Sequence, residues 1–513
     1  MTHNKIREDL LAIWQAGVDG VCTDKLIRNN VTLIEPNDKR NIDKRNYSIE
    51  IGNETSCEQY SLSEIDRIIV VGGGKASGGM AESLTKILEP ISESVEISGW
   101  VNVPNDCVKP LNKIYLHAAR PAGINEPTEE AVTGTNEIIR ILKSTTKFDL
   151  CICLISGGGS ALLPAPVAEI SLQDKCGLIR FLNAAGATIQ EINSVRKIIS
   201  RIKGGRLKQI CRGKRLISLI LSDVIGDPLD VIASGMTVDS KSTAEEAVNV
   251  LRKFMPNQSE LSLQKINLQR IFDYVTLQAV LTKNSRESNL RISKIKTSNS
   301  GNVEPVESVE PVEPVELLDK IFDDEGGFVR NIVIGNNALA VEAAGMEAER
   351  RGYKQTMFSA LISDEAENVG RELIQMCFEM VSAGLDCLVH GGEPVVKLVS
   401  SEIRGVGGRN QQLVLAAVCE LIKIYGDKMI PLAILSAGTD GEDGPTDAAG
   451  AWIDPIAWEL LVNKIKQDSN FNPESFLNRN DAYNFFKQLN TLIKTGITGT
   501  NVCDLRIVIY KKE

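Results

Sequence analysis

Two short glycine-rich segments carry the residues best suited to bind an anion. Each follows a continuous apolar run, at 67–71 and 149–155, that predicts a buried strand. Glycine lets backbone N–H groups approach a negative ligand, and a following helix presents its positive end there. We expect these loops to bind phosphate or carboxylate, although a tight turn with a solvated lysine is the alternative for the first. The residues concerned are Gly73, Gly74, Lys75, Ser77, Ser156, Gly157, Gly158, Gly159 and Ser160.

Charged side chains follow in the next part of the chain. Arg196 and Lys203 belong to the basic stretch EINSVRKIISRIKGGRL of an otherwise acidic protein. Such a stretch is usually a solvated helix face, but the KGGR turn pairs cations with glycine amides, which suits an anion. Asp223 and Asp227 follow a third apolar run, 215–221. There a carboxylate can hold Mg²⁺, accept the proton of a hydroxyl, or only cap a helix.

The second half of the chain adds polar residues in glycine-rich loops. Arg409 opens a predicted helix, from which an arginine can stabilise charge on a transferring phosphoryl group. The loop AGTDGEDGPTDAAGA lacks the ligand spacing of an EF-hand, so a metal- or hydroxyl-binding loop and a plain acidic turn both stay open. The further binding residues predicted here are Glu393, Asn410, Thr439, Asp440, Thr498, Thr500 and Asn501, and the predicted metal ligands are Asp223 and Asp440.

Composition limits the kinds of partner. The net charge of −10 argues against a nucleic-acid face and against anionic lipid. The 11 cysteines include no CxxC pair, so we expect reduced thiols in a cytoplasmic protein. The N-terminal sequence has no targeting pattern, and the uncharged run 150–168 contains glycines and prolines, so we expect no membrane span. With three histidines in the chain, the chemistry must rely on lysine, arginine and aspartate.

Apolar strands that alternate with helices predict an α/β protein with a parallel sheet covered on both faces. We expect an α/β domain over 1–281, a low-complexity linker or insertion over 282–324 that holds VEPVESVEPVEPVE, and a second α/β domain over 325–513. The active site is expected in the cleft between the domains. Other elements are predicted as helices at 6–18 and 338–351 and strands at 215–221, 331–334, 385–390, 430–435 and 506–509.

The motifs, taken in order, resemble those of the class II glycerate kinases, the glycerate 2-kinase family with a C-terminal MOFRL domain. The motifs are GGGKAS, SGGGSALL, EINSVRK, KGGRL, LSDVIGD, IASG, GGRNQ, GTDGEDGPTDAAGA and TGITGTNVCDL. The resemblance extends from the opening helix to residue 509 and leaves out the insertion near 282–316. It implies a Rossmann-like N-terminal domain and a smaller α/β C-terminal MOFRL domain, with the active site between them.

The resemblance implies a kinase that uses ATP with Mg²⁺ and D-glycerate and yields phosphoglycerate, with 2-phosphoglycerate as the first expectation. It implies that Lys75 and Arg409 are the essential cations and that Asp223 and Asp227 lie in the catalytic aspartate loop. The partners are then small molecules, and the chain is a monomer or a homodimer. Departures from the family pattern, such as Ile198 where histidine is frequent, leave substrate preference and rate open.

Two other functions are alternatives to a kinase. A hydroxypyruvate reductase with a nicotinamide cofactor needs a GxGxxG fingerprint, but Ser77 stands at the third glycine and histidine is scarce. A non-catalytic nucleotide sensor that docks through the repeat has no need of both Lys75 and Arg409. The kinase is therefore the preferred interpretation.

Overall fold

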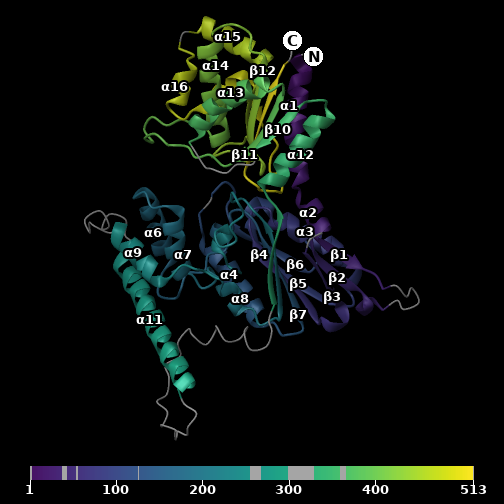
Figure 1. The fold of residues 1–513 in the computed structure, drawn as a ribbon, viewed down its shortest axis with the longest axis vertical. Helices are drawn as coiled ribbons and strands as arrows, with labels where there is room; N and C mark the ends of the chain where they lie inside the picture. The colour runs from purple at the N-terminus through teal and green to yellow at the C-terminus, as the bar shows by residue number, and fades with distance from the viewer. Residues whose placement is uncertain are drawn as a thin grey trace.

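The computed structural model describes residues 3–36, 43–53, 56–124, 126–254, 267–298, 328–358, 365–468 and 470–511. Within these ranges the chain forms two six-stranded sheets and one three-stranded sheet. Figure 1 shows the two large sheets in separate bodies, each flanked by helices. The predicted α/β fold in two domains is confirmed. No helix of the described ranges is both long and apolar enough to cross a bilayer.

The first sheet is parallel throughout, with the strand order β6-β5-β4-β7-β8-β9. Its strands are β4 (Arg67–Gly73), β5 (Glu96–Pro104), β6 (Ile114–Arg120), β7 (Asp149–Ile155), β8 (Arg215–Leu221) and β9 (Phe328–Gly335). Strand β9 pairs with β8, although the sequence placed it beyond the expected boundary at 325. An apolar run predicts a strand but does not indicate which sheet the strand joins.

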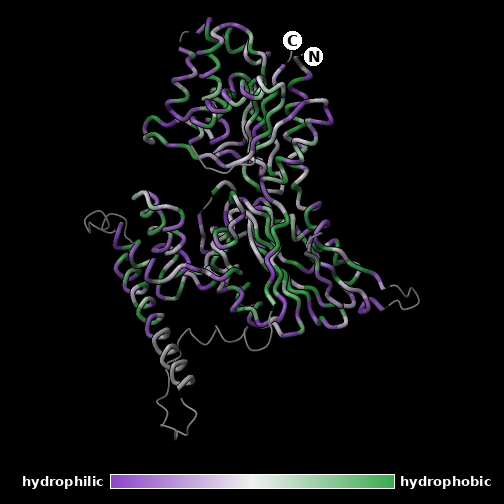
Figure 2. Tube along the Cα trace, in the orientation of Figure 1, coloured by the Kyte–Doolittle hydropathy of each residue, from purple (hydrophilic) through white to green (hydrophobic). Residues whose placement is uncertain are grey.

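Both faces of this sheet are buried, as its apolar strands predict. Ile68 and Val70 of β4 belong to one core, together with residues of α3 (Ser77–Leu88). Ile69 and Val71 belong to a second core, together with residues of α4 (Glu129–Lys143). The hydropathy colouring of Figure 2 follows this arrangement, with hydrophobic strands inside. Because β4, β7 and β8 are neighbours, the loops after them meet at one edge of the sheet.

The second sheet is mixed, with the order β10-β11-β15-β12-β13-β14. Strand β15, in its middle, runs antiparallel to both β11 and β12. The strands are β10 (Gln355–Phe358), β11 (Cys387–Gly392), β12 (Leu432–Gly438), β13 (Gly450–Ile453), β14 (Leu492–Ile493) and β15 (Asp504–Tyr510). The helices that follow α12 (Asn337–Arg350) are α13 (Ala366–Ser382), α14 (Arg409–Tyr425), α15 (Pro455–Gln467), α16 (Pro473–Leu477) and α17 (Ala482–Leu489).

The opening helix α1 (His3–Gly20) packs on the second domain, although the sequence placed it in the first. It contacts α12, β15 and β12, and the indole of Trp14 donates to the carbonyl of Ala437, 3.4 Å away. Added Cβ atoms on two of its glycines would overlap Leu505 and Ala343, so both allow a close approach. An amphipathic pattern shows that a helix has an apolar face but not what covers it.

The remaining elements form two smaller groups. The antiparallel sheet β1 (Val31–Ile34), β2 (Ser48–Asn53) and β3 (Ser56–Ser61) follows α2 (Thr23–Asn30) and was not predicted. A separate core joins α6 (Leu172–Ala184), α7 (Ile189–Ile198), α9 (Ala244–Phe254) and α11 (Leu268–Ser298). Helix α11 makes the first part of the expected linker, 282–298, helical, whereas the VEP repeat lies outside the described residues.

Candidate active site

The loops after β4 and β7 are bonded to each other at the carboxyl edge of the first sheet. The amide of Lys75 donates to the carbonyl of Gly157, 2.8 Å away, and the amide of Ala76 donates to Ser156 Oγ, 3.0 Å away. The four amides of residues 74–77 all donate within the protein. This loop therefore offers an anion the charge of Lys75 rather than an open row of N–H groups, which differs from the sequence interpretation.

Asp223 and Asn501 lie directly against the second loop. A Cβ at Gly157 would overlap both the carboxylate of Asp223 and the side-chain amide of Asn501. A glycine is therefore required at this position by close approach alone. Burial raises the pKa of Asp223, and the negative charge of Asp440 raises it further, against a lowering by Lys75. Asp223 is thus a carboxylate with an increased affinity for a proton.

Lys75 reaches two carboxylates of the second domain. Its Nζ lies 2.8 Å from Oδ2 of Asp440 and 2.5 Å from Oε2 of Glu442. Burial opposes the charge on Lys75, but these two carboxylates outweigh it and raise the pKa of the lysine. Asp440 was predicted from the sequence and Glu442 was not, although both belong to the same GTDGEDG loop after β12.

Arg409, at the start of α14, is likewise paired with two carboxylates. Its guanidinium makes two bonds to Asp504, at 2.7 and 2.8 Å, and lies 3.3 Å from Oε1 of Glu393. Asp504 is fully buried at the start of β15 and was missed, because the sequence there indicates only a strand. A paired charge of this kind is held in one orientation by a bidentate bond.

The N-terminus of α14 is fixed by Asp443. Its carboxylate accepts the backbone amides of Asn410 and Gln411, at 3.0 and 2.9 Å. A Cβ at Gly408 would overlap this carboxylate, so glycine is needed just before the helix. Asp443 thus satisfies two donors that the helix itself leaves free and sets the position of Arg409.

Cys503 lies between Asp223 and Glu393. Its Sγ lies 2.9 Å from the carbonyl oxygen of Asp223 and 3.9 Å from Oε2 of Glu393. Glu393 in turn is paired with Arg409. The structure therefore brings Lys75, Asp223 and Arg409 into one constellation.

Several predicted residues hold the surrounding loops together. Thr439 donates to the carbonyl of Cys503 and Thr498 donates to the carbonyl of Thr439. Thr500 donates to the carbonyl of Val21, and Asn410 contacts Asp443 and Ser436. Their side chains are engaged with protein atoms, so their part in the site is to shape it.

The side chain of Asp227 contacts a different part of the protein from that of Asp223. Its carboxylate accepts the side-chain amide of Asn336 at 2.5 Å, and Asn336 caps the start of α12. Its backbone has a φ of 52°, in the left-handed region. The structure thus shows Asp227 in contact with the residue that begins α12.

Comparisons with known proteins agree on one family. Residues 9–266 match the model of a domain of unknown function, DUF4147, and residues 386–504 match the MOFRL family. A glycerate kinase of Danio rerio is 32% identical and covers 97% of this chain and 96% of its own. A D-glycerate 2-kinase of Thermotoga maritima is 32% identical, over 86% of this chain and 90% of its own. The chain belongs to the glycerate kinase family.

The fold agrees with this assignment. A crystal structure of glycerate kinase from Thermotoga maritima superposes with a TM-score of 0.69 at 27% identity, covering 99% of this chain and all of the other. A Pyrococcus horikoshii structure gives a TM-score of 0.67 at 29% identity. Both domains and their order are therefore those of the family.

A magnesium site built from protein ligands alone is not found among the described residues, which contain no group of three or more His, Cys, Asp and Glu side chains placed to hold a metal. Magnesium is usually held by one or two carboxylates together with substrate phosphates. The negative charge of Asp440 contributes to the raised pKa of Asp223, so the two carboxylates lie in one site. These carboxylates fit a metal that arrives with a nucleotide.

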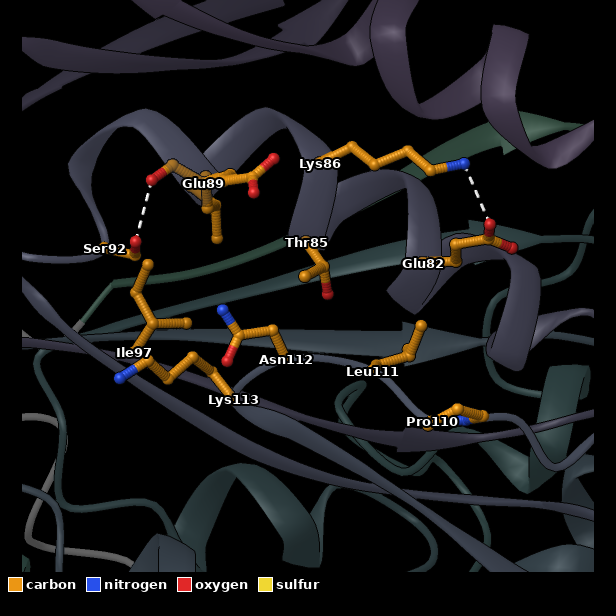
Figure 3. Close-up of a pocket in the computed structure, with 11 residues that line it drawn as sticks. Glu82, Thr85, Lys86, Glu89, Ser92, Ile97, Pro110, Leu111, Asn112 and Lys113 are labelled. Carbon is orange, nitrogen blue, oxygen red and sulfur yellow. Dashed lines mark hydrogen bonds and ion pairs between the residues drawn. The ribbon is translucent and has the colours of Figure 1, made fainter.

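Two pockets differ in their relation to this constellation. A cavity of about 20 Å³ is lined by Lys75, Asp440, Glu442, Arg120 and Thr500 among others, which leaves room for about one water molecule. A larger pocket of about 290 Å³ lies at the last turns of α3. Figure 3 shows its polar rim. Because α3 starts next to Lys75 and lines the pocket from Glu82 onward, that pocket begins about 8 Å along the helix.

Proposed function

We propose that the chain is a kinase that transfers the γ-phosphate of ATP, in the presence of Mg²⁺, to D-glycerate and forms 2-phosphoglycerate. The family assignment supports the substrate, because relatives over nearly the whole chain are named glycerate kinases. The observation that carries the mechanism is that Lys75 of the first domain pairs with Asp440 of the second. Cys503 in turn lies between the carbonyl of Asp223 and Glu393, the partner of Arg409.

The two cations suit the charge that develops during phosphoryl transfer. The transferred group spreads negative charge over its oxygens while the attacking and leaving oxygens stand in line. Lys75 and Arg409 would donate to these oxygens once the substrates separate them from their carboxylates. Such separation is required, since the cavity beside Lys75 holds only about 20 Å³ in this structure.

Asp223 suits the role of the base. Its raised pKa favours acceptance of a proton from the substrate hydroxyl. That hydroxyl oxygen then forms the new bond to the γ-phosphorus, and ADP leaves with the electrons of the broken P–O bond. Asp227 was a second candidate, but its contact with Asn336 favours a role in holding α12, so we assign the base to Asp223.

Of the two predicted metal ligands, Asp440 and Asp223, we propose Asp440 for magnesium, because Asp223 is assigned to the proton. When bound, Mg²⁺ supplies positive charge to the β- and γ-phosphate oxygens. Glu442 and Glu393 lie beside them and, when Lys75 and Arg409 turn to the phosphoryl group, are free to accept the hydroxyls of glycerate.

The function is tested by measuring ADP release from ATP and Mg²⁺ with and without D-glycerate. Glycerate-dependent ADP with a product that enolase consumes directly supports a 2-kinase. A product that needs a phosphoglycerate mutase before enolase would mean transfer to the 3-hydroxyl. ADP release that does not depend on glycerate, together with NADH oxidation by hydroxypyruvate, would overturn the proposal in favour of a reductase.

A further inference from the structure

A group of three cations, two of them buried and one half-buried, lies beside the loop 156–160, and part of it was not visible in the sequence. It consists of Lys175 on α6, Arg196 on α7 and Lys203 in the KGGR turn, and we call it the cationic corner. Lys175 is 4% exposed and its Nζ has no hydrogen-bond partner within the described part of the chain. Burial, together with the charge of Arg196, lowers the pKa of Lys175 to about 8.

Lys203 joins the cationic corner to two loops. Its Nζ donates to Ser160 Oγ at 2.9 Å, to the carbonyl of Ala233 at 3.1 Å and to Ser234 Oγ at 3.3 Å. The residue is 1% exposed. Ala233 and Ser234 both have left-handed backbones, with φ of 49° and 62°. Strain of this kind is retained where the surroundings hold it, and it concentrates at functional sites.

No carboxylate neutralises these three cations among the described residues. Arg196 has an uncharged partner, Asn193 Oδ1, at 3.4 Å, and the ion pairs of the described chain include none of the three. The adjacent Lys197 does have one, Asp230 at 3.5 Å. Lys75 and Arg409 each have two carboxylates. A buried charge without a partner is costly, and the lowered pKa values of Lys175 and Lys203 reflect that cost. An anion bound from solution would relieve it and keep these lysines charged.

The cationic corner is close to the reacting groups. Ser160 contacts Lys203, and Gly157 in the same loop contacts Asp223. Three residues span at most about 11 Å. An extended anion can therefore contact the cationic corner at one end and reach Asp223 at the other.

We propose that Lys175, Arg196 and Lys203 bind the polyphosphate of the nucleotide, an inference that rests on the proposed kinase function. Charge decides between the two substrates. A carboxylate carries one negative charge, whereas a single phosphate group carries about 1.5–2 near neutral pH and a polyphosphate carries more. Glycerate would leave most of the positive charge of the cationic corner without a partner. Glycerate is then assigned to the part of the site beside Asp223, Lys75 and Arg409.

The test compares ligand binding by the full-length protein and its Lys175→Met variant. Calorimetric titrations would use ATP, inorganic tripolyphosphate and D-glycerate, each added alone. Removal of one charged hydrogen-bond donor should weaken ATP and tripolyphosphate by about 10- to 100-fold and leave glycerate unchanged. Lys253→Met is the matched control, because this lysine is 61% exposed and pairs with Glu191 on the same helical group. It should bind all three ligands like the wild type.

Other outcomes have definite meanings. A loss of glycerate binding with unchanged tripolyphosphate binding would overturn the assignment and make the cationic corner a carboxylate site. Unchanged binding of every ligand would also overturn it. If Lys175→Met does not fold, tripolyphosphate is tested on the wild type: it should compete with ATP but not with glycerate, and failure to compete with ATP contradicts the inference. Lys175-dependent nucleotide binding without phosphorylation of glycerate would leave this inference standing and remove the proposed function.

Discussion

Lys75 and Arg409 are each neutralised by two carboxylates from other loops, and the cationic corner has none. On the proposed mechanism, Lys75 and Arg409 exchange their carboxylate partners for the oxygens of the transferred phosphoryl group. The three cations of the corner lack any such partner among the described residues. On the proposed mechanism, the two paired cations therefore act in phosphoryl transfer and the cationic corner binds the polyphosphate.

Lys75→Met should lower kcat by about 10²–10³-fold or more, because one preorganised charge on the transferring group is removed. ADP production by the purified variant, with circular dichroism to show that it is folded, is the measurement. Lys86→Met is the matched control, since this lysine is on α3, the helix that follows the Lys75 loop, is 53% exposed and is paired with Glu82. Turnover at the wild-type rate in Lys75→Met would refute the mechanism.

The stability of the wild type should rise with pH between about 8 and 10.5. Burial and Arg196 lower the pKa of Lys175 from 10.5 to about 8, so the unfolded chain binds more protons in that range. The shift corresponds to about 3 kcal/mol. Lys175→Met should therefore be the more stable protein at pH 8 and lose most of this advantage at pH 10. Cys176 on α6 and Lys203 are the other titrating neighbours.

Urea unfolding of both proteins at the two pH values is the appropriate measurement. A difference between variant and wild type that does not change with pH would contradict a lowered lysine pKa. Lys253→Met again serves as control, because its side chain is 61% exposed and its replacement leaves the buried Lys175 in place.

At the scale of single residues the sequence predicted the cations and Asp223, because glycine-rich loops after apolar strands identify them. It could not predict Asp504 or Lys175. Asp504 is placed inside a strand, and a lysine in an amphipathic helix is normally solvated. Only the packing of α6 against α7 and the KGGR turn shows that this lysine is buried.

At the scale of elements, most strands and helices were predictable from apolar periodicity, whereas their partners were not. Strand β9 and helix α1 were predicted as elements. However, β9 pairs with the sheet of the first domain and α1 packs on the second domain, each the reverse of the expectation. Register and pairing depend on contacts far apart in sequence, which a local pattern does not contain. The site depends on such contacts too, since Asp443 fixes the helix that carries Arg409.

Asp443→Ala should leave two amides at the start of α14 without an acceptor. We expect a loss of stability of about 1–3 kcal/mol for buried donors left unpaired. We also expect a decrease in kcat larger than the change in KM for ATP, because Arg409 is no longer oriented. Urea unfolding and steady-state kinetics are the two measurements.

Asp427→Ala is a suitable control, since this aspartate is 68% exposed and pairs with Lys466 on the surface. It should change stability by less than about 0.5 kcal/mol. If Asp443→Ala were as active and as stable as this control, the capping role of Asp443 would be wrong.

At the scale of the whole molecule, α1 ties the beginning of the chain to its last strand. A Cβ at Gly17 would overlap Leu505 and lie 2.9 Å from the carbonyl of Ala340. Gly17→Leu should destabilise the second domain by about 2–3 kcal/mol, because the helix can no longer approach this surface. Tryptophan fluorescence during urea unfolding reports it, since Trp14, Trp452 and Trp458 lie in this region.

Glu8→Leu places the same side chain on an exposed position of α1 and should cost little. Equal stabilities of the two variants would mean that the close contact of α1 with α12 and β15 does not support the second domain.

The position of α1 also has a consequence for how the protein is made. Trp14 leaves the ribosome early, but its hydrogen-bond partner Ala437 follows 423 residues later. At about 5–20 residues per second, the helix waits roughly 20–85 s for that partner. Strands β4 to β8 are complete well before then. During most of the synthesis of the chain, the apolar face of α1 therefore has no surface to cover it. Cotranslational chaperones are expected to bind that helix, and release from them would be among the last steps of assembly.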